Sequence, residues 1–233
     1  MEGKIKYLFN MDAIIKKKSL LGVGLYTIPD VAKILRLDKT FVRRWLHEYW
    51  GNKFNNKNLS SWGTGRDKAI PFFTLIEFYV FYQLRRQGLS AQNIAKSHEI
   101  ISQELDTPFP FANSIILHDG KKVFYTTIDG DSIINADRSK QINFKSIIEQ
   151  FCRKIDFDKD QLALRYWPLG KEKNIVVDPH HQLGQPTIKN TNILAETLYS
   201  MYTSGEKISF ISSLYEVSES DVKASIEFFK KAA

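Results

Sequence analysis

The segment YTIPDVAKILRLDKTFVRRWLHEYW, residues 26–50, decides how the first part of the chain folds. Thr27 can cap the first free backbone amides of a helix, and Pro29 sits where no intrahelical hydrogen bond is needed. Asp38 then interrupts the pattern and can cap another helix. The sequence therefore predicts a short helix, a turn and a second helix over residues 39–50.

This second helix carries two opposed stripes. Apolar residues recur at the spacing of one helical face, and a polar, cationic stripe lies about half a turn away. The apolar stripe is Val42, Trp45, Leu46 and Tyr49, and the polar stripe is Thr40, Arg43, Arg44 and His47, with Lys39 at the helix start. Two helices joined by such a turn can place side chains in the DNA major groove. The alternative is an amphipathic helix pair with a solvated basic face.

Charge is distributed unevenly. The 233 residues have a net charge of +7, and residues 1–100 hold 17 Lys and Arg against 8 Asp and Glu. Residues 101–233 hold 16 Lys and Arg against 18 Asp and Glu. This division favours an N-terminal part that binds a polyanion and a C-terminal part that contacts protein, although a solvated lysine-rich surface gives the same pattern.

Composition narrows the class of protein. Hydrophobic residues make up 43% and charged residues 25%, which is typical of a folded globular chain. The apolar runs are far short of about 18 residues, and the N-terminus lacks a secretory leader pattern. The single Cys152 excludes an intramolecular disulfide. We therefore expect a cytoplasmic protein with no membrane span.

After the helix pair, residues 51–69 are rich in Asn, Gly and Ser and predict a wing that contacts phosphates. Its basic residues are Lys53, Lys57, Arg66 and Lys68. Helices are predicted over residues 72–87 and from the cap Ser90 to about residue 105. Two prolines, Pro108 and Pro110, end this first domain, residues 1–110.

These segments resemble one known family. YTIPDVAKILRLDKTFVRRWL, GTGRDKAIPFF and TLIEFYVFYQLRRQGLSAQNIAKS are similar to the DNA-binding half of MerR-type regulators. The resemblance implies a winged helix-turn-helix in which Thr40, Arg43, Arg44 and Arg66 contact operator DNA. The long dimerisation helix of MerR activators is missing, so dimerisation must lie elsewhere in the chain.

The middle segment, residues 111–177, predicts a small α+β connector. Asp119-Gly120 favours a hairpin over residues 114–125. A helix is expected over residues 144–155, with Cys152 as an ordinary buried thiol. Strands follow at residues 162–167 and 174–177.

Catalytic and metal-binding patterns are weak. Asp156-x-Asp158-x-Asp160 begins like a calcium loop, but Gln161 and Trp167 stand where Gly and Glu are required. His180-His181 beside Asp178 lacks a third ligand and is interpreted as a surface loop. No phosphate-binding glycine motif or nucleophile elbow occurs. We predict no enzyme activity, metal or cofactor.

The last part, residues 178–233, predicts three short helices. They span about residues 193–203, 209–215 and 221–231, with Ser218 capping the last. Their expected core is Ile193, Leu198, Tyr202, Ile208, Ile211, Leu214, Val222, Ile226 and Phe229. Residues 191–233 hold six acidic and four basic residues, which favours contact with protein over contact with DNA.

NIVVDPHHQLGQPTIKNTNI and TSGEKISFISSLYEVSESDVKASIEFF resemble the small conserved domain of unknown function found in VapB-type antitoxins. Asp178-Pro179, Gly184-Gln185-Pro186 and Thr191-x-Ile193 match its pattern. Asn190, Asn192 and Leu194 stand where Gly, Arg and Pro are common, so no role of that arginine is carried over. RYWPLGKEKN lies just before this domain, and the MerR-like segment lies at the start of the chain. The order of these segments along the chain resembles one larger VapB subgroup.

The resemblance implies an antitoxin that represses its own operon as a homodimer on operator DNA and neutralises a PIN-type ribonuclease toxin. The toxin-binding candidates are Arg165, Trp167, Lys230 and Lys231. Alternatively, Arg165 is an outward-facing strand residue, Trp167 belongs to the core, and the two lysines form a solvated helix end. The alternative function is a stand-alone MerR-like regulator whose C-terminal half dimerises or senses a ligand. The predicted fold class is α+β, mainly α.

Overall fold

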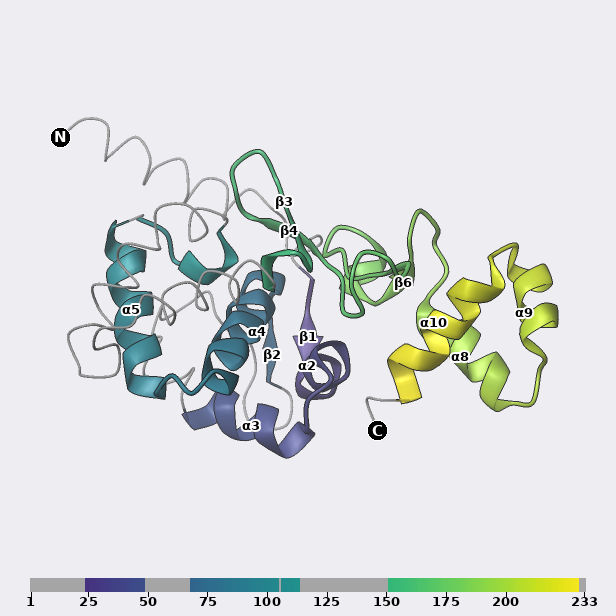
Figure 1. The fold of residues 1–233 in the computed structure, drawn as a ribbon, viewed down its shortest axis with the longest axis horizontal. Helices are drawn as coiled ribbons and strands as arrows, with labels where there is room; N and C mark the ends of the chain where they lie inside the picture. The colour runs from purple at the N-terminus through teal and green to yellow at the C-terminus, as the bar shows by residue number, and fades with distance from the viewer. Residues whose placement is uncertain (1–23, 49–67, 105, 114–150, 231–233) are drawn as a thin grey trace.

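The structure is a computed structural model, and it describes residues 24–48, 68–104, 106–113 and 151–230. The fold class, α+β and mainly helical, is as predicted. Figure 1 shows α2 to α5 grouped at one end of the molecule, α8 to α10 at the other, and β6 between them. The predicted hairpin over residues 114–125 lies outside the described residues.

The first unit starts with a strand and a helix pair: β1 (Tyr26–Thr27), α2 (Ile28–Leu35) and α3 (Lys39–Glu48). The predicted caps are confirmed. Thr27 and Asp30 form a reciprocal capping box, in which the Thr27 amide donates to the Asp30 carboxylate at 2.9 Å. The Phe41 amide donates to Asp38 at 2.9 Å, and this cap fixes where α3 begins.

Strand β2 (Ala69–Ile70) pairs antiparallel with β1, with Tyr26 opposite Ile70. Residues 51–67 of the predicted wing lie outside the described residues, so the winged arrangement stays a prediction. The pairing nevertheless brings the end of that segment back against the start of α2. The two strands therefore join the helix pair to the next helix, α4 (Phe72–Arg86).

A buried carboxylate connects α4, α5 (Ala91–Glu104) and the short helix η2 (Pro110–Ala112). Glu77 on α4 is 1% exposed, and it accepts hydrogen bonds from the amides of Phe111 at 2.6 Å and Ala112 at 3.1 Å. Its other oxygen lies 2.6 Å from Nε2 of His98 on α5. This cluster satisfies amides that would otherwise be buried without partners.

The middle of the chain differs from the prediction at one helix. The expected helix over residues 144–155 does not reach Ile155, which instead starts β3 (Ile155–Phe157). This strand pairs antiparallel with β4 (Ala163–Tyr166), with Ile155 opposite Tyr166. Ile155 has the spacing of the apolar face of the predicted helix, but an isoleucine is equally suited to a buried strand. Pairing with β4 makes it part of a strand. Cys152 is half-buried.

The Asp156-x-Asp158-x-Asp160 pattern belongs to the β3–β4 hairpin. Asp158 accepts hydrogen bonds from the amides of Asp160 and Leu162, each at 2.9 Å, which forms an Asx-type turn. Asp156 accepts from the indole N–H of Trp167 at 2.8 Å and pairs with Lys171 at 2.6 Å. The Asp158 carboxylate is thus engaged within the hairpin, and the Asp156 carboxylate is engaged by residues that directly follow it.

The C-terminal part begins with β5 (Ile175–Val176), which pairs antiparallel with β6 (Thr187–Ile188). Val177 also bridges to Tyr166 of β4. The short helix η4 (Gln182–Gly184) lies in the loop between β5 and β6. Helices α8 (Ala195–Thr203), α9 (Ile208–Tyr215) and α10 (Glu219–Lys230) follow.

The three C-terminal helices match the prediction with two corrections. Helix α8 begins at Ala195 because residues 191–194 form the turn and bridge that follow β6. Leu214 is 53% exposed, so it does not belong to the predicted core, and Phe210 one turn earlier on α9 is 49% exposed. The predicted cap of α10 is confirmed, since the Asp221 amide donates to Ser218 Oγ at 3.1 Å.

The described residues form two hydrophobic cores. The first spans α2 to α5 and also takes in Phe151, Ile155, Ala163, Tyr166 and Val177. The described part of the predicted connector therefore packs onto the N-terminal helices. The second core joins β5 and β6 to α8, α9 and α10.

The two units touch at α2 and β1. Lys33 on α2 pairs with Glu196 on α8 at 3.0 Å, and its ammonium lies 5.2 Å from the centre of the Phe229 ring. Gly184 packs directly against the Tyr26 ring. Within the described ranges, no helix has the length and apolar character needed to span a bilayer.

Candidate functional site

The polar face of α3 is the first candidate surface. Lys39, Thr40, Arg43, Arg44 and His47 are all exposed, whereas Val42, Trp45 and Leu46 are at most 5% exposed. The predicted division of α3 into a packed face and a cationic face is confirmed. Neither Arg43 nor Arg44 forms an ion pair with another described residue.

Lys68 has a different position from the one expected of a wing residue. Its ammonium donates to the carbonyl of Leu46 near the C-terminal end of α3 at 2.7 Å, and partial burial lowers the pKa of Lys68 below its ordinary value. Lys68 thus satisfies a helix-end carbonyl instead of projecting freely. The other three basic residues of the predicted wing, Lys53, Lys57 and Arg66, lie outside the described residues.

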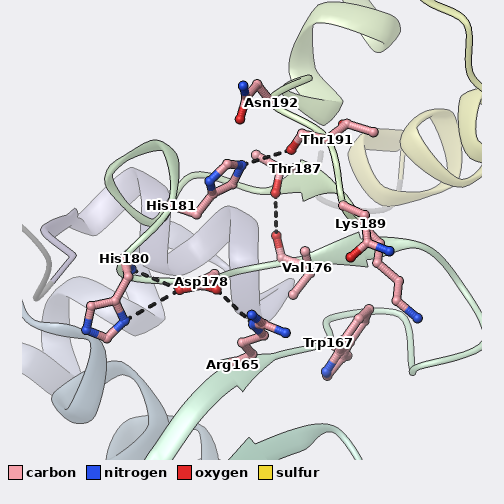
Figure 2. Close-up of a pocket in the computed structure, with 11 residues that line it drawn as sticks. Arg165, Trp167, Val176, Asp178, His180, His181, Thr187, Lys189, Thr191 and Asn192 are labelled. Atoms are coloured by element: carbon pink, nitrogen blue, oxygen red, sulfur yellow. Dashed lines mark hydrogen bonds and ion pairs between the residues drawn. The ribbon is translucent and has the colours of Figure 1, made fainter.

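A pocket of about 380 Å³ is the second candidate site. Figure 2 shows its walls: Arg165 and Trp167 from β4 and the residue after it, Asp178 with His180 and His181 from the loop after β5, and Lys189, Thr191 and Asn192 from the turn after β6. Three separate segments of the chain therefore meet in one concavity.

Strand alternation directs Arg165 into the pocket. Tyr166 is 2% exposed and packs against Tyr79 of the N-terminal core, with a ring separation of 4.9 Å. Burial raises the pKa of the Tyr166 phenol well above its ordinary value. Since neighbouring residues of a strand point to opposite faces, Arg165 faces away from that core. Its Nε donates to Asp178 at 2.8 Å.

Trp167 forms the apolar side of the pocket. It is 4% exposed, and its indole N–H is occupied by Asp156. The Lys189 ammonium lies 5.7 Å from the centre of the Trp167 ring, within the range of a cation–π contact. Lys189 is exposed, and within the described ranges it forms no ion pair.

Asp178 and His181 shape the loop after β5. Asp178 also accepts from the His180 amide at 2.9 Å, and His180 Nδ1 lies 3.6 Å from it. His181 Nε2 lies 2.8 Å from the carbonyl oxygen of Thr191, so the loop after β5 is joined to the turn after β6. The two histidines lie on a loop, as expected, and His180 is exposed; the same loop forms one wall of the pocket.

Of the four predicted toxin-binding residues, the structure brings two together. Arg165 and Trp167 line the pocket, whereas Lys230 lies at the end of α10, with its ammonium 5.2 Å from the centre of the Tyr202 ring. Lys231 lies outside the described residues. Lys189 was missed by the sequence analysis, and its only signal was the polar run Lys189 to Asn192 before a helix.

A metal site finds no support in the described part of the chain, where no group of three or more His, Cys, Asp or Glu side chains is placed to hold an ion. In the pocket, Asp178 is engaged by Arg165, and the carbonyl of Thr191 engages His181. The two cationic side chains of the pocket, Arg165 and Lys189, are hydrogen-bond donors only, which suits an anion better than a cation.

Known proteins resemble the chain in two ways. The family described as "Protein of unknown function (DUF433)" matches residues 175–229. A curated protein of Mycobacterium tuberculosis strain H37Rv, named "Putative antitoxin VapB45", is 22% identical over 224 residues, covering 88% of this chain and 93% of that protein. The chain is therefore similar to a protein named as an antitoxin along most of its length.

A solved structure shares the fold. The crystal structure of Rv2018 from Mycobacterium tuberculosis superposes with a TM-score of 0.68 at 18% identity. The match covers 86% of this chain and 96% of that one. The arrangement of both units thus recurs in an experimentally determined protein.

Proposed function

We propose that this protein is the antitoxin of a type II toxin–antitoxin system. It binds operator DNA through the exposed face of α3 and so represses its own operon, and it neutralises a PIN-type ribonuclease toxin through its C-terminal half. The observation that carries the proposal is the division of α3 into a packed face and a cationic face whose arginines form no ion pair with another described residue. Similarity to a protein named as an antitoxin supports it.

The geometry suits major-groove binding. Helix α2 packs against α3, and the caps at Thr27 and Asp38 fix the turn between them. Thr40, Arg43 and Arg44 lie on the first turns of α3, where a recognition helix meets base edges. A MerR-like wing over residues 51–69 would add phosphate contacts through Lys57 and Arg66.

DNA binding is tested by gel shifts on the promoter upstream of the gene. Arg43→Ala and Arg44→Ala should each reduce specific affinity by about 1 to 3 kcal/mol, because each removes a side chain that reads bases. Arg153→Ala is the matched control, since Arg153 is exposed outside the helix pair. Unchanged binding by the Arg43/Arg44 double variant would remove α3 as the DNA-reading helix.

Toxin neutralisation is tested by co-expression with the adjacent nuclease gene. The full chain is required, because β3 and β4 bury residues in the N-terminal core and a fragment starting at residue 111 would expose them. The chain carrying Arg43→Ala and Arg44→Ala should lose repression but still restore growth. Loss of growth rescue in a correctly folded double variant would contradict the division of roles between the two units.

The alternative, a stand-alone regulator that senses a small ligand, is favoured by one observation. A volume of about 380 Å³ falls in the range of small-molecule sites, roughly 300 to 1,000 Å³. Gene neighbourhood and co-purification separate the two functions. An adjacent nuclease that co-purifies with the chain supports the antitoxin, and its absence supports the regulator.

A further inference from the structure

We propose that the pocket between β4 and the turn after β6 is a socket for a single carboxylate side chain, supplied by an acidic segment of a protein partner. The proposal rests on the proposed function in one respect, because the toxin is the partner expected to present that segment. An exposed arginine or a lysine-containing tail of this chain would be expected to insert into the partner, and the socket implies the opposite direction. The partner's acid enters this chain, and no cation of this chain enters the partner.

The first step is the position of Arg165. Its Nε is held by Asp178 at 2.8 Å, which fixes the guanidinium against the pocket wall. The two terminal nitrogens of the guanidinium have no hydrogen-bond partner among the described residues. A guanidinium held in this way can present its remaining N–H groups to a carboxylate as a planar pair.

The second step is the charge of the pocket. Arg165 and Lys189 supply two positive charges and Asp178 one negative charge. The resulting excess of one positive charge matches one carboxylate. A terminal phosphate monoester carries about −1.5 to −2 at neutral pH and would remain undercompensated beside Asp178. The charge balance therefore favours an Asp or Glu side chain over a terminal phosphate.

The third step concerns Trp167. Nucleotide and single-stranded RNA sites use an exposed aromatic face on which a base can stack. Trp167 is only 4% exposed, and Lys189 lies over its ring, so no such face is offered. Lys189 instead holds its ammonium at the pocket edge through this contact, which reduces the ordering that binding requires.

The fourth step is the rim. Asn190 and Asn192 are exposed beside Thr191, and their amide groups form no hydrogen bond with another described residue. Amides placed around a charged centre can bind the backbone of an extended segment whose acid enters the pocket. The site thus combines a charged centre with a polar rim, as a peptide socket requires.

The test is the selection of short random peptides displayed on phage against the full-length protein, with the Arg165→Gln/Lys189→Gln double variant as soluble competitor. Recovered peptides should contain Asp or Glu. Changing that acid to Asn or Gln, or introducing either pocket substitution, should weaken binding about tenfold or more. Arg153→Gln and Lys159→Gln are the matched controls and should leave the affinity unchanged, because both residues are exposed outside the pocket.

Lys189→Gln keeps the test valid if Arg165→Gln disturbs folding, since Lys189 has no ion pair to lose within the described ranges. Peptides without an acidic residue, binding that ignores both substitutions, or no recovered peptide would overturn the proposal. Inorganic phosphate or AMP that binds the pocket more tightly than the acidic peptides would overturn it in favour of a nucleotide site.

The outcome is independent of the toxin assay. Acidic peptides selected by a chain that binds no nuclease would leave the socket in place and reject the proposed function. A nuclease complex that is indifferent to Arg165→Gln and Lys189→Gln, with no acidic peptides recovered, would reject only the socket.

Discussion

Gly184→Ala should weaken the junction between the two units. Gly184 has a φ of +83°, and an added Cβ would overlap the hydroxyl of Tyr26 and lie 2.8 Å from its Cζ. Tyr26 is 0% exposed and belongs to β1, which pairs with β2, so its ring has little freedom to move away. The substitution therefore places a methyl group where both the backbone and the neighbour resist it.

Two effects set the magnitude. A non-glycine residue in the left-handed region costs roughly 1 to 2 kcal/mol. Overpacking a close contact typically adds about 1 to 3 kcal/mol. The free energy of unfolding should thus fall by about 2 to 5 kcal/mol, measured by urea denaturation followed by circular dichroism.

Gly205→Ala separates the two effects. Gly205 has a φ of +100°, but nothing lies within 4 Å of its added Cβ, so this variant should show only the backbone cost. Tyr26→Phe removes the overlapping hydroxyl, which has no hydrogen-bond partner among the described residues. In the double variant it should restore about 1 to 2 kcal/mol of the loss caused by Gly184→Ala.

Equal losses for Gly184→Ala and Gly205→Ala would refute the reasoning. The same holds if Tyr26→Phe brings no relief, because the two residues would then not be in close contact. Either result would show that the loop after β5, and with it the pocket wall, does not pack tightly against β1 of the N-terminal unit.

Three further predictions concern stability and assembly. Glu77→Ala should lower the free energy of unfolding by about 3 to 5 kcal/mol, since it removes the buried acceptor of two backbone amides and one histidine; a loss below about 1 kcal/mol in urea denaturation would contradict this. Burial raises the phenol pKa of Tyr26, Tyr79 and Tyr166 above the ordinary value of 10. The stability that depends on their neutral form should therefore be present below pH 10 and lost as the pH rises further. In an absorbance titration these phenols should ionise at higher pH in the native protein than in the unfolded protein. The protein should be a dimer by light scattering, and Phe210→Ser with Leu214→Ser should make it monomeric if the exposed apolar pair on α9 is the interface; a monomeric wild type would count against operator binding as a dimer.

Local chemistry made much of the fold predictable. Caps are interactions between residues three positions apart, so Thr27, Asp38 and Ser218 correctly marked where helices begin. The two faces of α3 were equally visible, because helical periodicity separates the apolar residues from Arg43 and Arg44. The fold class and the cationic surface can therefore be predicted from short segments of sequence.

Local signals failed where two structures satisfy the same pattern. Ile155 continues an apolar helical stripe, but it is also suited to a buried strand, and pairing with β4 made it a strand. Leu214 has the spacing of a core residue, yet the packing of α8, α9 and α10 leaves it half exposed. Periodicity indicates that a face is apolar, and only the neighbouring elements decide whether it is covered.

The sequence by itself determined the helix starts, the amphipathic faces and the excess of positive charge at the front of the chain. Only the tertiary structure decided that Arg165, Asp178 and Lys189 share one pocket, and that Gly184 meets Tyr26. The physical reason is distance along the chain. Caps and stripes depend on residues within a few positions of one another, whereas the pocket and the junction form only when β4, β5 and β6 pair and the second unit packs against α2.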